Sequence, residues 1–434
     1  MKVSKSLIAN KILRGGDWPC GLAILYVAAV AGAALSFALR GVLEFPDTWS
    51  FVNAWDDSLS SGRIDAWRMP VYPCLIGLMK MLLGTHFGVG VVLVQYGVFL
   101  LSLKYFYRFA SHVLCSRKMV FAASLLYIFP FMLWHSVLQT ESLTMSLSVF
   151  ILWSAVRLRE RFSAKIFAVY VLSTALTVFM RPASVCILPA MFVWWVYVGV
   201  FERRRKAALW CIGLTVAASL SLGCYMKAFE REYGMLGITK ISLVNQLFIL
   251  FDRDIVNLEL IEDESLREDV KLCVERFKMP YGGYAVVEYL QSRYEPRTLN
   301  RMLTVQYGKQ PRRYIEKTFQ YIAKTKTYAL YIYGWPTMAA ILDILGVNVG
   351  MFYVFMIVYT LLSVAWMIYR RRAAPKTLLL LIMSWSVFAF VIAGAQNDWK
   401  RLVFTTCLPV YILMACQACM VLCSVFRMKY IEPK

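Results

Sequence analysis

Charged residues and histidines are scarce in this 434-residue chain. Charged side chains make up 17% of it, and only three residues are histidine, whereas about a quarter of a soluble domain is charged. The scarcity of histidine argues against a histidine-based metal site. The sequence also lacks a Walker motif, a nucleophile elbow and a zincin motif, which disfavours nucleotide hydrolysis and serine-hydrolase chemistry. No clear tandem repeat and no low-complexity tract occurs.

The 11 cysteines form neither a disulfide framework nor a metal-site spacing. Most of them fall within apolar runs, and Cys416, Cys419 and Cys423 share one helix face. This pattern is typical of small residues in a helical core.

Apolar residues, in contrast, are abundant. The chain is 60% hydrophobic and 15% aromatic, which predicts an all-α polytopic membrane protein. Apolar runs of membrane length predict ten spanning helices, at residues 19–39, 87–107, 119–137, 142–156, 166–180, 184–200, 207–226, 349–369, 377–394 and 402–425.

The basic residues lie in short clusters between these runs. The formal charge of +21 therefore reflects membrane topology rather than a nucleic-acid partner, because cytoplasmic loops are enriched in Lys and Arg. With ten spans, both termini and every basic cluster are predicted to be cytoplasmic. The residues before the first run are predicted to be an uncleaved cytoplasmic tail.

Two further apolar runs are not counted as spans. The run 71–84 is only about 14 residues long, too short to span a bilayer, and it contains Lys80. A span there would move every later basic loop to the outside, so an interfacial or re-entrant helix is predicted. The same argument excludes 328–345, which contains Gly334, Pro336 and Asp343.

Three parts of the chain are expected. Residues 1–226 form an N-terminal membrane module that includes a first outer loop at 40–86 with interfacial helices. Residues 227–330 are hydrophilic, with alternating charge and a Pro-Tyr-Gly-Gly turn, and predict a small, mainly helical extracytoplasmic subdomain. Residues 331–434 form the C-terminal membrane helices.

Polar residues from separate parts of the chain are predicted to meet on the outer face. They come from the loop between Glu44 and Pro73, the turn before Glu141, the Arg181 corner and the loop 396–401. Charges at helix ends beside an apolar bundle suit a substrate with a lipid tail and a charged, sugar-bearing head.

The loop carries two motifs, Asp47-Thr-Trp-Ser-Phe-Val-Asn-Ala54 and Arg68-Met-Pro-Val-Tyr72-Pro73. They resemble the GT-C superfamily of polytopic glycosyltransferases, in particular enzymes similar to family 39 and the aminoarabinose and mannosyl transferases. The resemblance covers roughly 19–200 and 396–412. It continues with an acid at the start of the fourth predicted span, an arginine after the fifth and a basic pair before the last: Glu141, Arg181, Lys400 and Arg401.

This resemblance implies an enzyme of the bacterial inner membrane. Such enzymes transfer a sugar from a polyprenyl-phosphate or diphosphate donor to a glycan, lipid or protein acceptor on the outer face. The chemistry fits independently, because one carboxylate acting as general base can activate an acceptor hydroxyl. The leaving phosphate needs cations rather than an acid, so inverting transfer requires no carboxylate pair.

Asp47 is the candidate catalytic base, with helix N-capping as the alternative. Candidate substrate-binding residues are Arg68, Tyr72, Glu141, Arg181, Lys400 and Arg401. Simpler roles are open for most of them: Arg68 pairs with Asp65, Glu141 interacts with a helix dipole, Arg181 anchors at the interface, and Lys400 and Arg401 pair with Asp398. A divalent metal is also open, with Asp47 and Glu141 as its ligands.

Two other functions fit parts of the pattern. An O-antigen-type polymerase or ligase also combines many spans with a large outer loop, and Arg297, Arg312 and Arg313 in that loop do not exclude it. A transporter or flippase of lipid-linked glycans is disfavoured, because transporters place charges at mid-membrane and often contain repeats. Asp343, within an apolar run, is the residue that best fits a transporter.

Overall fold

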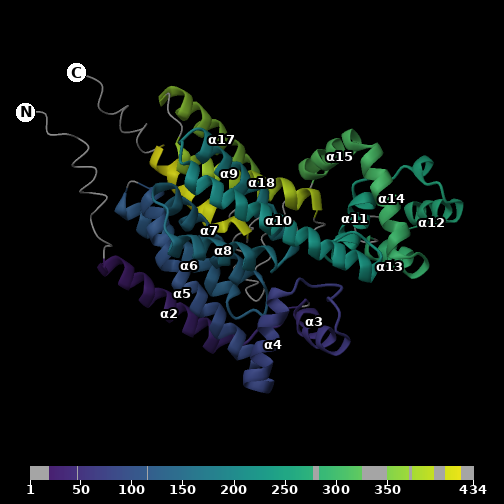
Figure 1. Ribbon diagram of the computed structural model, residues 1–434, viewed down its shortest axis with the longest axis horizontal. Helices are drawn as coiled ribbons and strands as arrows, with labels where there is room; N and C mark the ends of the chain where they lie inside the picture. Colours follow the sequence, from purple (N-terminus) through teal and green to yellow (C-terminus); the bar gives the residue numbers. More distant parts are fainter. Residues whose placement is uncertain are drawn as a thin grey trace, which may run out of the picture.

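The computed structural model describes residues 19–45, 47–114, 116–276, 283–324, 349–370, 374–394 and 406–421. Within these residues the secondary structure is helical, apart from one isolated bridge between Leu43 and Val137. The predicted all-α class is therefore confirmed for this part of the chain (Figure 1).

Every predicted span falls on a helix. These helices are α2 (Pro19–Arg40), α5 (Phe87–Val113), α6 (Arg117–Trp134), α7 (Glu141–Glu160), α8 (Ala164–Val178), α9 (Ile187–Val200), α10 (Arg205–Tyr233), α17 (Val349–Arg370), α18 (Pro375–Gly394) and an unlabelled one, Thr406–Val421. Among the described residues, six segments are long and apolar enough to cross a membrane: Cys20–Arg40, Val71–Val113, Glu141–Glu160, Pro182–Val200, Arg205–Tyr233 and Pro375–Gly394. The chain is thus a polytopic membrane protein, while ten spans and their orientation stay predictions.

The run 71–84 forms a helix of its own, α4 (Val71–Leu83). Gly84 follows it with a φ of +56°, a conformation that only glycine adopts without strain. A short 3₁₀ turn, η1 (Gly84–His86), then leads into α5. Gly84 therefore separates α4 from the long helix after it; an interfacial position for α4 stays a prediction, since Val71–Val113 together qualifies as one apolar segment.

α4 packs against α3 (Thr48–Ser61), the helix of the first outer loop. The Trp55 ring of α3 lies so close over Gly77 that a Cβ there would come within 2.0 Å of it. At the other end of the contact, Lys80 Nζ lies 2.5 Å from Asp56 Oδ2. The missing side chain at Gly77 thus lets the two helices approach closely.

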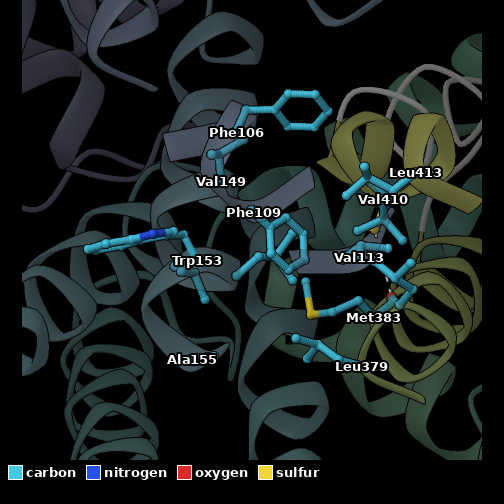
Figure 2. Close-up of a cluster of buried hydrophobic side chains, with 14 of the residues drawn as sticks. Phe106, Phe109, Val113, Val149, Trp153, Ala155, Leu379, Met383, Val410 and Leu413 are labelled. Atoms are coloured by element: carbon cyan, nitrogen blue, oxygen red, sulfur yellow. Dashed lines mark hydrogen bonds between the residues drawn. The ribbon is translucent and has the colours of Figure 1, made fainter. Parts of the chain in front are cut away.

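α7 is the central helix of the bundle, and all but three of its 20 residues are buried. Helices α5 and α8 pack along it. Figure 2 shows side chains of four helices meeting in this core: Phe106, Phe109 and Val113 of α5, Val149 and Trp153 of α7, Leu379 and Met383 of α18, and Val410 and Leu413 of 406–421. Close packing of this kind is what holds helices together where the surroundings are as apolar as the core.

The two ends of the bundle differ in charge. α7 has 20 residues and is therefore about 30 Å long, with Glu141 at its start and Arg157 and Arg159 in its last turn. At the end that carries these arginines, Lys376 of α18 donates a 2.6 Å hydrogen bond to the His112 carbonyl of α5. Basic residues of α7 and α18 thus lie at the opposite end from Glu141, while the orientation of this end in the membrane stays a prediction.

The hydrophilic region forms a compact helical unit beside the bundle, around the end of α10 (Figure 1). It contains α11 (Lys240–Asp252), η3 (Leu258–Leu260), α12 (Glu264–Arg276), α13 (Gly283–Arg293), α14 (Pro296–Lys309) and α15 (Pro311–Lys324). Its own apolar core includes Phe229, Leu247, Val270, Leu290 and Leu299. The domain boundaries at 226 and 330 stay predictions.

Candidate functional site

Asp47 occupies the N-cap position of α3, but its carboxylate makes no capping hydrogen bond to the helix. It faces Arg68 instead, with 3.0 Å between Asp47 Oδ1 and Arg68 Nη2. The Asp47 side chain is 39% exposed. The alternative of a capping carboxylate therefore fails, and the acid is held by a guanidinium at the surface.

Arg68 is fixed by three contacts with the start of α3. Besides its bond to Asp47, its Nε donates to Ser50 Oγ at 2.6 Å, and its guanidinium lies 4.2 Å from the centre of the Phe51 ring. Asp65 does not pair with this guanidinium, because its Oδ1 accepts the backbone N–H groups of Trp67 and Arg68. Asp65 thus shapes the turn that presents Arg68 to Asp47.

Glu141 and Arg181 form a second acid–arginine pair, and this pair is buried. Glu141 Oε1 lies 3.6 Å from Arg181 Nη2, and the side chains are 4% and 7% exposed. Glu141 begins α7, and Arg181 is extended just before the short turn η2 (Pro182–Cys186). The buried Arg181 side chain does not reach for an aqueous interface; it turns inward to a carboxylate, as buried charges require.

Backbone contacts bring the two pairs into one neighbourhood. The Thr48 hydroxyl, next to Asp47, donates to the Leu138 carbonyl at 3.1 Å, three residues before Glu141. The Val71 N–H, at the start of α4, donates to the Phe179 carbonyl at 3.2 Å, two residues before Arg181. The first outer loop is thus attached to the two segments that carry the buried pair.

Tyr72 lies between the pairs and is fully buried. Its ring packs edge-on against Phe51 at 5.1 Å, beneath Arg68, and Glu141 is near enough to act on it electrostatically. Its hydroxyl donates to Gln95 Oε1 at 3.1 Å, and Gln95 Nε2 donates to the carbonyls of His135 and Val137. Tyr72 therefore has its partner inside the protein and supports the residues that form the surface of the site.

The remaining candidates lie outside the described residues. Lys400, Arg401 and Asp398 belong to the segment 395–405, and the run 328–345 with Asp343 belongs to 325–348. The structure therefore brings together Asp47, Arg68, Tyr72, Glu141 and Arg181, out of the seven candidate residues.

A divalent metal does not fit the donors at this site. Each of the two carboxylates, Asp47 and Glu141, already faces an arginine, and a cation would have to displace that guanidinium. Nowhere in the described part of the chain do three or more His, Cys, Asp or Glu residues form a group that could hold a metal ion. No step of the chemistry is therefore assigned to a metal.

Sequence reasoning missed Arg253, which follows α11 and is 4% exposed. Its Nη1 donates to Thr318 Oγ1 at 2.9 Å and its Nη2 to the Ile392 carbonyl of α18 at 2.8 Å. Arg253 thus fastens the helical unit to the bundle. The one available signal was an arginine directly after an apolar run, and this signal does not identify the partner.

No family model matches the chain, and no curated protein matches it. Among solved structures, it is similar to two crystal structures of the Archaeoglobus fulgidus oligosaccharyltransferase. The complex with zinc and sulfate has 14% identity and a TM-score of 0.45, over 89% of this chain and 48% of that one. The form tethered to an acceptor peptide with an NVT sequon has 13% identity and a TM-score of 0.46, over 90% and 49%. The chain spans about half the length of these neighbours.

Proposed function

We propose that the protein is a membrane glycosyltransferase. It moves a sugar from a polyprenyl-phosphate donor to a hydroxyl or amino group of a glycan, lipid or protein acceptor on the outer face of a bacterial inner membrane. The observation that carries the proposal is the Asp47–Arg68 pair, an accessible carboxylate 3.0 Å from a guanidinium at the end of an apolar helix bundle. The resemblance of 47–54 and 68–73 to GT-C enzymes of the family 39 and aminoarabinose type supports it.

Asp47 and Arg68 supply the two groups that sugar transfer from a phosphate requires. Asp47 accepts the proton of the acceptor group while the acceptor oxygen or nitrogen forms a bond to the anomeric carbon. The bond from that carbon to the donor phosphate breaks, and its electron pair leaves with the phosphate. Arg68 stabilises the negative charge that develops there. A single displacement of this kind inverts the anomeric centre.

The surroundings of the pair suit a donor with a lipid tail. Exposed apolar side chains lie on α3, on the loop after it and on α4: Trp49, Leu59, Trp67, Leu78, Met81 and Leu82. Two of them are next to the charged pair in the chain, since Trp49 is two residues after Asp47 and Trp67 directly precedes Arg68. An exposed apolar surface next to a charged pair provides for both parts of a lipid phosphate. Arg181 is proposed to act by holding Glu141 in place, and Lys400 and Arg401 stay candidate phosphate ligands.

The polymerase and transporter alternatives gain no support from the described residues. Arg313, one of the loop arginines that a polymerase could use, donates to the Asp254 carbonyl and to Gln310 Oε1. It is thus engaged within the helical unit. No second function is therefore proposed.

The test is an Asp47→Asn variant, which keeps the shape of the side chain and removes the base. Purified protein in lipid vesicles is assayed for transfer from a panel of polyprenyl-phosphate sugars. We expect transfer to fall by about 10²–10⁴-fold, the usual contribution of a general base. Asp57→Asn, which changes an exposed acid on the same helix, is the matched control and should keep its activity. Wild-type transfer by the Asp47→Asn protein would remove Asp47 as the base, and no transfer by the wild type would contradict the donor class.

A further inference from the structure

Helix α15 has an apolar stripe that is wider than the face covered by the rest of the protein. On the covered side, Thr318 is buried and accepts a hydrogen bond from Arg253, and Tyr321 packs against the same guanidinium. Beside this face, Ile315 and Phe319 lie one turn apart and are 54% and 66% exposed. Two large apolar side chains thus project from a helix whose docking to the bundle does not use them.

The level of α15 relative to the membrane follows from its contacts with α18. Tyr314 Oη donates to the Ala393 carbonyl at 2.7 Å, and Arg253, which also holds Thr318, donates to the Ile392 carbonyl. α18 is a candidate span that ends at Gly394. α15 therefore lies beside this end of α18 (Figure 1). The last carbonyls of a spanning helix lie where the apolar layer meets water, which puts α15 at that level.

The candidate site lies at the same end of the helix bundle as α15. The first residues of α18 lie near the end of α7 that bears its arginines, since Lys376 bonds to His112 and His112 lies 3.7 Å from Glu160. The last residues of α18 therefore lie toward the end that carries Glu141. α15 and the Asp47–Arg68 pair thus face the same side of the membrane.

The charges of α15 suit a lipid surface. Arg312 is exposed and lies seven residues before Phe319, so both are on one side of the helix. Lys317 is engaged with Asp254 at 2.5 Å, which fixes the rotation of the helix. Glu316 and Gln320 are exposed next to the stripe, on the polar side. An apolar stripe that continues into an exposed arginine, with polar residues on the opposite side, is the pattern of a helix that lies in the membrane interface.

We propose that α15 lies along the outer leaflet, with Ile315 and Phe319 among the acyl chains and Arg312 against lipid phosphates. Phospholipid of the bilayer is thus the occupant of this surface, and the helical unit is held down on the membrane rather than projecting freely into water. This proposal does not depend on the glycosyltransferase activity.

Photo-crosslinking tests the proposal without any sugar donor. In the full-length protein, Phe319 is replaced by p-benzoylphenylalanine, and the protein is reconstituted in vesicles of phosphatidylethanolamine and phosphatidylglycerol with radiolabelled acyl chains. The matched control carries the probe in place of Gln320. We expect several-fold more labelled lipid on the Phe319 position than on the Gln320 position.

Two outcomes would overturn the proposal. One is equal lipid labelling at the two positions, and the other is a probe at 319 that reacts only with protein. Because the probe could disturb folding, both proteins are first compared with wild type by size-exclusion chromatography, and Ile315 is probed in the same way. The Arg312→Gln change in the Phe319 probe background should lower labelling, and the loss should be larger in vesicles that contain anionic phosphatidylglycerol than in vesicles of phosphatidylcholine alone, because only phosphatidylglycerol carries a net negative charge. Unchanged labelling in both kinds of vesicle would exclude the phosphate contact.

Discussion

The two acid–arginine pairs of the candidate site consist of the same chemical groups but differ in their surroundings. The Asp47–Arg68 pair lies at the surface on the first outer loop, with the acid more exposed than the arginine. The Glu141–Arg181 pair lies almost fully inside the protein, at the start of α7 and before η2. Only the first acid is placed where an acceptor molecule from water can reach it.

The difference in burial indicates a structural role for the Glu141–Arg181 pair and a chemical role for Asp47. A buried ion pair gains little over an apolar pair, but the loss of one partner leaves an uncompensated charge in a medium that does not solvate it. An exposed pair contributes little to folding, because water screens it. We therefore expect Glu141 and Arg181 to hold the helices that frame the site, and Asp47, which is partly exposed, to exchange Arg68 for substrate.

The largest expected effect is that of Glu141→Leu on stability. This change leaves the Arg181 charge buried without its carboxylate, and the loss of one partner of a buried pair costs about 3–5 kcal/mol. Thermal unfolding of the purified protein in detergent measures the loss. Arg181→Met should have a similar effect, because it leaves the Glu141 carboxylate buried without its arginine.

The double variant Glu141→Leu/Arg181→Met sharpens this prediction. Because it removes both charges, it should recover most of the stability that either single change loses. If the single variants unfold at the wild-type temperature, the buried pair is not a structural element and the contrast between the two pairs is wrong.

The next largest loss of stability is expected for Gly77→Ala, which disturbs the packing of α4 against α3, the helix that begins after Asp47. The new Cβ would meet the Trp55 ring at 2.0 Å, so α3, which follows Asp47, must shift against α4. Overpacking of this kind costs about 1–3 kcal/mol. We expect lower thermal stability and weaker transfer, with recovery when Trp55→Leu is added. Gly97→Ala, where no atom lies within 4 Å of the added carbon, is the control; equal losses for both alanine variants would contradict the packing argument.

The sequence predicted the helices well, because the signal for a membrane-length helix is local. Each of the ten apolar runs falls on a helix, and a single residue, Gly84, accounts for the break after 71–84. The orientation predicted from the clusters of basic residues stays a prediction. The hydrophilic region was predicted as helical from its charge pattern, and it is helical where the structure describes it.

The partners of the charged residues could not be predicted, because they come from distant parts of the chain. Arg68 was expected to choose between a phosphate and the nearby Asp65, but its guanidinium bonds to Asp47, 21 residues earlier. Arg253 bonds to a carbonyl 139 residues later. Such pairings depend on how the helices pack against one another. The periodicity and composition of a single segment do not show which distant residue will lie next to it.

A smaller effect is expected for Asp47→Asn on stability. The pair it breaks is partly exposed, and such pairs contribute about 0–1 kcal/mol. The unfolding temperature should therefore stay close to that of the wild type, even though we expect transfer to be lost. A large loss of stability would instead make Asp47 a structural residue and remove the distinction between the two pairs.

The smallest effect on transfer is expected for Asp269→Asn, which tests whether an acid–arginine pair outside the site affects transfer. Partial burial pushes the pKa of the Asp269 carboxyl upward, but hydrogen bonds from Tyr294 and Tyr289 and the charge of Arg293 outweigh it and hold the pKa below its ordinary value of 3.8.

A lowered pKa in the folded state means that Asp269 stabilises the fold above pH 3.8 and that this contribution is lost as the pH falls through the lowered pKa. The Asn variant should therefore transfer sugar normally at pH 7 and lose less stability than the wild type when unfolding is measured from pH 5 down to pH 3. Asp269 lies in α12, in the helical unit and away from the bundle core. Impaired transfer at pH 7 by this variant would therefore mean that the effect of Asp47→Asn reflects the loss of an ion pair in general and not the loss of a base.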